Sequence, residues 1–153
     1  MAEKVYIRQS VELEIDGSRI TVGSHSKPNT VDIAGEYQDK RVSVAASSGT
    51  DLLWNKAATS EPLSDFDFLA LMATKAVTVE FIVDDGNNVG EVVFTIDLAA
   101  GKDGLYGPMF LLTSDASNAN AAAGFSGTAD VIEKIQVKNT GSTASLVRII
   151  MAT

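Results

Sequence analysis

The sequence predicts an all-β fold: a two-sheet antiparallel sandwich of jelly-roll type, with about nine strands. Three observations support this prediction. Apolar and polar residues alternate along many short segments, turn-forming residues separate these segments, and no segment of ordinary helix length repeats its apolar residues with a period of 3.6. Two packed antiparallel sheets are the natural way to bury many strands that are apolar on one side, and a jelly roll fits their number and length.

The clearest pair of strands lies in residues 77–98, on either side of a polar turn at residues 84–88. If Phe81 lies opposite Phe94, one face becomes wholly apolar. The further pairs on that face are Val77 with Leu98, Val79 with Ile96 and Val83 with Val92, and the other face pairs Glu80 with Thr95 and Thr78 with Asp97. A slip of one residue would move every side chain to the wrong face, so the register is well specified.

One pair on the polar face of this hairpin is apolar, because the same register puts Ile82 opposite Val93. A small apolar spot on an outer sheet face predicts that something covers it. Ile82 and Val93 are therefore candidate interface residues.

A second hairpin is predicted in residues 11–22. Val11, Leu13 and Ile15 alternate with glutamates, and Asp16-Gly17 then supplies a strong signal for a two-residue turn. That turn pairs Ile15 with Ser18, Leu13 with Ile20 and Val11 with Val22, and it places Glu14 opposite Arg19 as a favourable charge pair.

Further strands are expected at residues 40–46, 52–54, 65–72, 108–112, 132–138 and 146–151. Residues 65–72 fit a strand or a helix, and the alternation of Phe66 and Phe68 favours a strand. Residues 23–35 and 114–128 are expected to form loops, with a single helical turn at 118–123 as an alternative.

We expect two parts in the chain: an N-terminal arm at residues 1–10 and one sandwich domain at residues 11–153. The arm precedes the first well-defined strand and carries Val5, Tyr6 and Ile7. Such arms are either disordered or docked on another chain. These three residues therefore join Ile82 and Val93 as the candidate interface.

The composition narrows the functional classes. A net charge of −8 with scattered lysines and arginines argues against nucleic-acid binding. The absence of cysteine excludes disulfides and cysteine-based zinc sites. Charges near the N-terminus argue against a signal peptide, and no apolar run approaches the ~20 residues of a membrane helix. We expect synthesis and folding in a cytoplasm.

Candidate catalytic groups are few. His25 lies beside two serines but is expected to be an exposed loop histidine. Asp65 and Asp67 share one face of the expected strand and are expected to be a solvated face above a core. We therefore expect no catalytic residue and no enzyme activity.

Candidate ligand sites are equally weak. Residues 84–88 offer oxygen ligands that suit calcium, but their spacing departs from an EF-hand loop, and a plain turn is favoured. Trp54, Tyr6, Tyr37 and Tyr106 are too scattered to form a sugar-binding platform, and Trp54 is expected in the core. We expect no metal and no cofactor.

Two passages carry a resemblance to a known class. Residues 64–71, SDFDFLAL, run into residues 77–81, VTVEF, and residues 135–144, IQVKNTGSTA, precede the last strand. These phrases resemble small virion structural proteins of tailed bacteriophages, especially capsid decoration or cement proteins with jelly-roll folds. The resemblance covers roughly the second half of the chain, and no functional residue can be transferred from it.

The resemblance implies a non-enzymatic protein that binds the major capsid protein on the outer surface of an assembled capsid, often as a trimer. It would then stabilise the shell by bridging neighbouring capsid subunits, without contacting nucleic acid or a membrane. Two alternatives stay open: another phage tail, fibre or head-spike component, and a carbohydrate-binding β-sandwich module.

Overall fold

The computed structural model describes residues 3–15, 18–33, 36–63, 66–84, 92–113 and 131–153. The chain divides into two compact units, Met1–Gly35 and Glu36–Thr153. The first unit contains β1 (Glu3–Ile15) and β2 (Ser18–Ile33), which form a two-stranded antiparallel sheet. The predicted pairs hold in this sheet: Ile15 lies opposite Ser18, Glu14 opposite Arg19, Leu13 opposite Ile20 and Val11 opposite Val22.

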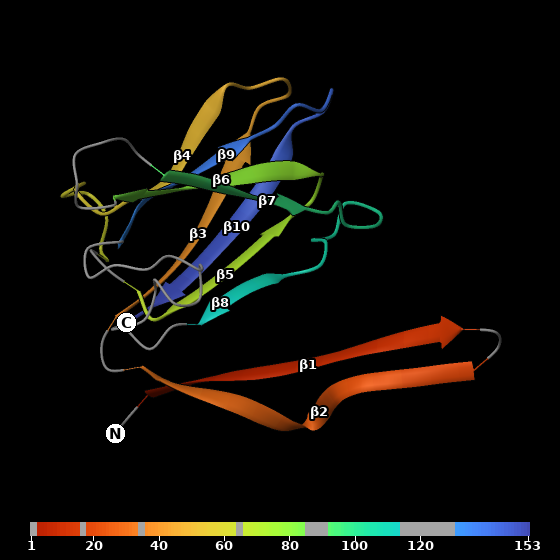
Figure 1. Ribbon diagram of the computed structural model, residues 1–153. Coiled ribbons are helices and arrows are strands. Elements are labelled where there is room, and N and C mark those ends of the chain that lie inside the picture. Colours follow the sequence, from red (N-terminus) through yellow and green to blue (C-terminus); the bar gives the residue numbers. More distant parts are fainter. Residues whose placement is uncertain (1–2, 16–17, 34–35, 64–65, 85–91, 114–130) are drawn as a thin grey trace. The chain divides into compact units, whose positions relative to one another are not determined.

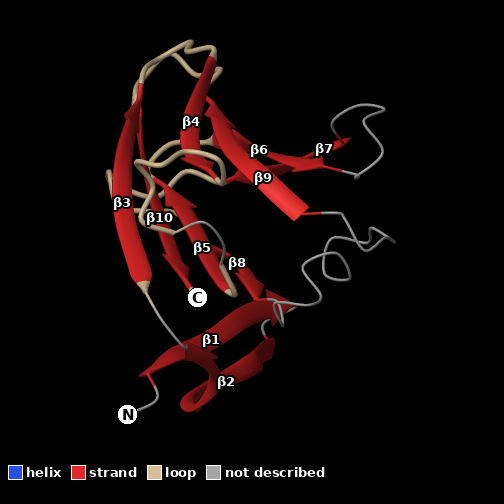
Figure 2. Ribbon diagram, turned by 90° about the vertical axis from the view of Figure 1, so that its left-hand side faces the viewer, coloured by secondary structure: helices blue, strands red, loops and turns tan. Residues whose placement is uncertain are grey.

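The second unit is a sandwich of two four-stranded antiparallel sheets (Figures 1 and 2). One sheet has the order β3-β10-β5-β8 and the other the order β4-β9-β6-β7. The strands are β3 (Tyr37–Val44), β4 (Thr50–Asn55), β5 (Phe68–Ala73), β6 (Val77–Asp84), β7 (Val92–Leu98), β8 (Phe110–Thr113), β9 (Val131–Lys138) and β10 (Ser145–Ala152).

The pairing follows the sequence in mirror order. The first strand of this unit pairs with the last, the second with the last but one, and so on: β3 with β10, β4 with β9, β5 with β8 and β6 with β7. The chain thus forms one long hairpin that is rolled into two sheets, which is the jelly-roll arrangement. The prediction of an antiparallel two-sheet sandwich is confirmed.

The β6–β7 hairpin has the predicted register at all seven pairs, from Val77 opposite Leu98 to Val83 opposite Val92. Phe81 stacks directly on Phe94, with ring centroids 4.5 Å apart. The hairpin is therefore held by the cross-strand aromatic pair that the alternation pattern had indicated.

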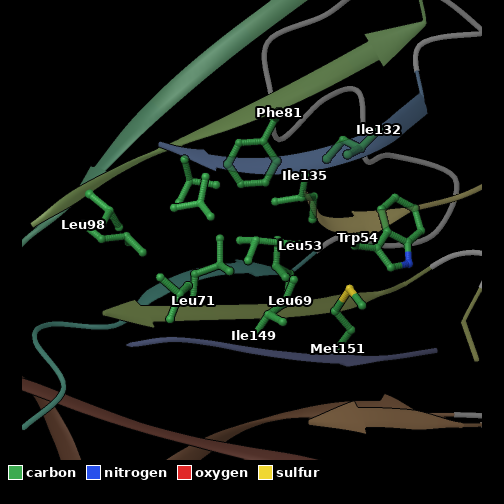
Figure 3. Close-up of a cluster of buried hydrophobic side chains, with 14 of the residues drawn as sticks. Leu53, Trp54, Leu69, Leu71, Phe81, Leu98, Ile132, Ile135, Ile149 and Met151 are labelled. Atoms are coloured by element: carbon green, nitrogen blue, oxygen red, sulfur yellow. The ribbon is translucent and has the colours of Figure 1, made fainter. Parts of the chain in front are cut away.

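The core fills the space between the two sheets (Figure 3). Phe81 and Ile135 face it from one sheet, and Leu71 and Ile149 face it from the other. All four side chains are fully buried. Each sheet thus buries the apolar face that the other sheet needs, as expected for a sandwich.

Two irregularities in the ladders change which residues face the core. The register of β4 against β9 shifts between Leu52 and Trp54, and both Leu53 and Trp54 are fully buried. The register of β6 against β9 shifts between Ile82 and Val83, because Ile82 lies opposite Lys134 and Val83 opposite Ile132. An extra residue interrupts the alternation of sides, and the one in β4 places two consecutive apolar residues, Leu53 and Trp54, in the core. The extra residue of the second irregularity lies in β9.

The expected loop at residues 23–35 is wrong, because β2 continues to Ile33. The register explains how proline fits there: Gln9 lies opposite Ser24, whereas Ile7 lies opposite Asn29. Residues 25–28, including Pro28, fall within this shift and have no registered partner, so the missing N–H of proline breaks no ladder bond.

Several predictions differ from the structure or fall outside the described residues. β1 runs through residue 10, so the division between units falls after Gly35, and residues 11–33 lie outside the sandwich unit. The strand expected at residues 65–72 is a strand, but it begins at Phe68. The turns at residues 16–17 and 84–88 and the loop at residues 114–128 lie wholly or mostly outside the described residues. Within the described residues, no helix has the length and apolar character needed to cross a membrane.

Candidate interaction surface

Ile82 and Val93 lie opposite each other on the outer face of the β4-β9-β6-β7 sheet, as the sequence predicts. Ile82 is only 6% exposed, whereas Val93 is 50% exposed. Ile82 is therefore covered, and Val93 leaves an apolar side chain in solvent at the edge of the sheet.

The other three candidate residues lie in β1 of the first unit. Val5 lies opposite Val31, Tyr6 opposite Thr30 and Ile7 opposite Asn29. Tyr6 is 57% exposed and Ile7 is half-buried. The structure brings Ile82 and Val93 together and places these three in a strand of their own; their role in an interface stays a prediction.

A larger apolar surface lies on the outer face of the β3-β10-β5-β8 sheet. It consists of residues that alternate with the core-facing ones on β10, β5 and β8, and we call it the outer apolar face: Phe68, Ala70, Met72, Leu111, Leu146, Ile150 and Ala152. Phe68, Ala70 and Ala152 are buried, Met72, Leu111 and Ile150 are half-buried, and Leu146 is 37% exposed. Over its inner strands, this sheet is therefore apolar on both faces except at Arg148 of β10, which lies opposite Met72 on the outer face.

The outer apolar face was not predicted from the sequence, although β5 carries a signal for it. Its sequence, FLALMA, is apolar at every position. A strand with one solvated face alternates, whereas a strand with both faces covered reads as a continuous apolar run. The choice between a strand and a helix for residues 65–72 does not address this second apolar face.

A bidentate ion pair lies on the same face beside these residues. Arg148 Nε donates to Asp39 Oδ1 at 2.8 Å, and Arg148 Nη2 donates to Asp39 Oδ2 at 2.6 Å. These hydrogen bonds lower the pKa of Asp39, with a further contribution from the charge of Arg41. The pair is partly exposed, so its role is to fix a polar border beside the apolar residues and to add little stability.

A second polar cluster lies between β3 and the segment after β4. Lys40 Nζ donates to Glu61 Oε1 at 2.9 Å and to the Leu53 carbonyl at 3.1 Å, and Gln38 Nε2 donates to Glu61 Oε2 at 2.9 Å. Burial raises the pKa of Glu61, but the hydrogen bonds from Gln38 and Lys40 outweigh it and lower the pKa overall. Both donors hold the Glu61 carboxylate, so the cluster ties the two segments together.

The buried polar side chains also serve structure. Trp54 is fully buried and donates from Nε1 to the Leu63 carbonyl at 2.9 Å, so it cannot stack on a sugar. Asn139 is fully buried as well, and its Nδ2 donates to the Val44, Ala45 and Thr143 carbonyls. The expectation that Trp54 belongs to the core is confirmed.

The remaining candidate residues do not assemble into a site within the described part of the chain. His25 lies in β2 and not in a loop, while Asp65 and most of the possible calcium turn lie outside the described residues. Asp67 precedes β5, and its backbone N–H donates to the Ala152 carbonyl. Among the residues that the structure describes, no group of three or more metal-ligating side chains is present.

Comparison with known proteins finds no matching family model and no matching curated protein. One solved structure is similar, from work describing Bacillus endospore appendages as a novel family of disulfide-linked pili. It is 13% identical, covers 76% of this chain and 87% of that chain, and has a TM-score of 0.37. None of these comparisons identifies a phage capsid protein.

Proposed function

We propose that this chain is a non-enzymatic structural protein that binds other protein surfaces in a large assembly. The finer proposal is a decoration or cement protein on the outer surface of a tailed-phage capsid, with the major capsid protein as its partner. The observation that carries the proposal is the outer apolar face, on which Leu146, Ile150, Met72 and Leu111 keep part of their side chains accessible. Accessible apolar clusters on a sheet mark protein–protein contact sites.

The chemistry of this face favours a protein partner. The Asp39–Arg148 pair satisfies its own charges beside the apolar residues, so the face offers shape and apolar area. The net charge of −8 would repel packaged DNA and suits the outside of a shell. Several copies that each make weak contacts would bind an assembled shell far more tightly than they bind one isolated subunit.

The test compares binding of the purified protein to expanded capsids and to isolated capsid subunits of its own phage. We expect cosedimentation with capsids and little binding to subunits. Leu146→Glu should weaken capsid binding by about tenfold or more, because a contact would bury an unpaired carboxylate. Leu52→Glu is the matched control: Leu52 is 46% exposed on β4 of the other sheet, and this variant should bind normally.

Equal affinity for capsids and isolated subunits would contradict the cement role. An equal loss of binding in Leu146→Glu and Leu52→Glu would remove the outer apolar face from the proposal. Copy number per virion separates cement, with hundreds of copies, from a tail, fibre or head-spike component with a handful.

A further inference from the structure

The outer apolar face has an excess of positive charge at its border, although the chain as a whole is acidic. The chain contains 20 aspartates and glutamates and 12 lysines and arginines. The outer positions of β3, β10, β5 and β8, which alternate with the core-facing ones, carry three charged residues: Asp39, Arg41 and Arg148. Two arginines and one aspartate give this face a net charge of +1, against −8 for the whole chain. On this face, an acidic group of a partner is attracted and not repelled.

Arg41 lies directly opposite the other arginine of this face. In the ladder between β3 and β10, Arg41 pairs with Arg148. Like charges directly opposite each other on a sheet are unfavourable. Arg148 is already engaged, because its Nε and Nη2 donate to the two carboxylate oxygens of Asp39. The fold thus supplies a carboxylate to one of the two arginines and places the second arginine beside that pair.

Arg41 has no carboxylate of its own among the residues that the structure describes. Arg41 is exposed, and no ion pair or hydrogen bond joins its guanidinium to another described residue. The pKa of Asp39 is lowered mainly by the hydrogen bonds from Arg148 and to a smaller extent by the charge of Arg41. Because Asp39 and Arg148 nearly neutralise each other, Arg41 gains little net attraction from the pair. Its five N–H donors therefore face water or a partner.

The residues next to Arg41 on the neighbouring strand are accessible and apolar. On β10, Leu146 and Ile150 lie two residues to either side of Arg148, which is the residue opposite Arg41. They are therefore diagonal neighbours of Arg41, within reach of a long side chain. Leu146 is 37% exposed, and Ile150 and Met72 are half-buried. The guanidinium thus lies at the border of an apolar cluster that a partner can contact.

We propose that Arg41 binds a carboxylate of the partner protein, on a segment whose apolar side chains pack against Leu146 and Ile150. This inference rests on the proposed function, because it names the chemistry of the partner at the same face. Arginine suits this role, since its planar guanidinium binds a carboxylate through two parallel hydrogen bonds. The apolar contact supplies buried area, and the ion pair at its border selects partners that carry an acidic residue at that point.

The test measures binding to expanded capsids of its own phage. Arg41→Met keeps a long apolar stem and removes the charge. It should raise the dissociation constant about tenfold or more, because the carboxylate of the partner would then be buried without a cation. Arg41→Lys keeps a cation and should bind more tightly than Arg41→Met. Lys138→Met is the matched control: Lys138 is an exposed cation on β9 of the other sheet, and this variant should bind like the unmodified protein.

Two further measurements separate a charge contact from a structural role of Arg41. Added salt should weaken the capsid binding of the unmodified protein more than that of Arg41→Met, because salt screens the ion pair that only the unmodified protein makes. The melting temperature of Arg41→Met should stay within about 2 °C of the unmodified value, because the fold gains little from this charge.

If Arg41→Met bound capsids as tightly as the unmodified protein or more tightly, this inference would be overturned and the cement role would stand, since a purely apolar contact gains from methionine. Equal losses in Arg41→Met and Lys138→Met, or a fall of several degrees in the melting temperature of Arg41→Met, would overturn it as well. If the unmodified protein bound capsids no better than isolated subunits, the proposed function would fail, and this inference would fail with it.

Discussion

The two sides of the sandwich, where the sheets come to their edge strands, are completed differently. On the side of β3 and β4, polar groups close the gap between the sheets: Lys40 donates to the Leu53 carbonyl and to Glu61, and Trp54 donates to the Leu63 carbonyl. Leu63 is itself buried beneath this segment. Val44, Leu53 and Trp54 on this side are fully buried, and Val42 is half-buried.

On the side of β7 and β8, the described side-chain hydrogen bond lies within one sheet, from Thr78 to Asp97, and does not join the two sheets. The residues that face the core from these two strands are only partly buried: Phe94, Ile96, Phe110 and Leu112. Their contacts are mostly apolar, with Phe81 as the shared neighbour of Phe94 and Phe110. The difference teaches that one side is finished within the chain by hydrogen bonds, whereas the core-facing residues of the other side keep part of their apolar surface exposed.

The largest expected effect tests the contrast between Trp54, which is fully buried, and Phe94, which is only partly buried. Trp54→Ala removes a fully buried side chain and its hydrogen bond, and it should lower the free energy of unfolding by about 3–5 kcal/mol. Phe94→Ala, on the open side, should cost clearly less, about 1–3 kcal/mol, because part of its surface is already in water. Urea unfolding of both variants measures the difference, and equal losses would contradict the contrast.

The next prediction concerns Asn139, which seals the end of the sandwich where the chain crosses between the sheets. Its Nδ2 donates to the Val44, Ala45 and Thr143 carbonyls, and its Oδ1 accepts from the Gly141 N–H. Asn139→Asp keeps the shape but turns a donor into an acceptor that faces these carbonyls. We expect a loss of about 2–3 kcal/mol at neutral pH.

Thermal unfolding of Asn139→Asp at pH 7 gives the measurement, and Asn139→Ala is the comparison. The alanine variant removes the donor without adding a charge, so it should be no less stable than the aspartate variant. Ser142→Ala, at an exposed position of the same loop, should change the melting temperature little. If the aspartate variant were as stable as the unmodified protein, the hydrogen bonds donated by Asn139 would not stabilise this end of the sandwich.

The sequence predicts the register of the two local hairpins. In residues 77–98 the apolar alternation alone sets the register, and every predicted pair is present in β6 and β7. In residues 11–22 the turn signal and the alternation give the same pairs. Both are local antiparallel hairpins, in which the chain itself brings the partners together.

What the sequence could not predict depends on contacts between distant segments. The bulge that buries both Leu53 and Trp54 needs the opposing strand β9, more than 80 residues later. The reason that FLALMA is apolar at every position becomes clear only from the strand order, which places β10 and β8 on either side of it. Asn139 is a typical turn residue in the sequence, whereas in the structure its side chain donates to the Val44 carbonyl of β3. Which strands lie at the edges of the sheets can be known only from the strand order.

The smallest effect concerns Glu61, the central acceptor of the sealed side, and it depends on pH. Because the folded-state pKa of Glu61 is lowered, its stabilisation is present above the unfolded pKa of about 4.3 and is lost as the pH falls through the folded value. Glu61→Gln should therefore cost about 1–2 kcal/mol at pH 7, by leaving Lys40 with a weaker partner, and much less at pH 3.

Melting temperatures of the unmodified protein and of Glu61→Gln, measured from pH 7 to pH 3, should therefore converge as the pH falls. Asp39→Asn is the matched control on the outer face. Asp39, like Glu61, is a carboxylate with a lowered pKa that binds a cation, here Arg148, but this pair is more exposed. The loss of stability in Asp39→Asn should therefore have the same sign and stay below about 1 kcal/mol. If the difference in melting temperature between the unmodified protein and Glu61→Gln increased as the pH fell, the hydrogen bonds from Gln38 and Lys40 would not favour the charged form of Glu61. The side of β3 and β4 would then be closed mainly by Trp54 and Leu63.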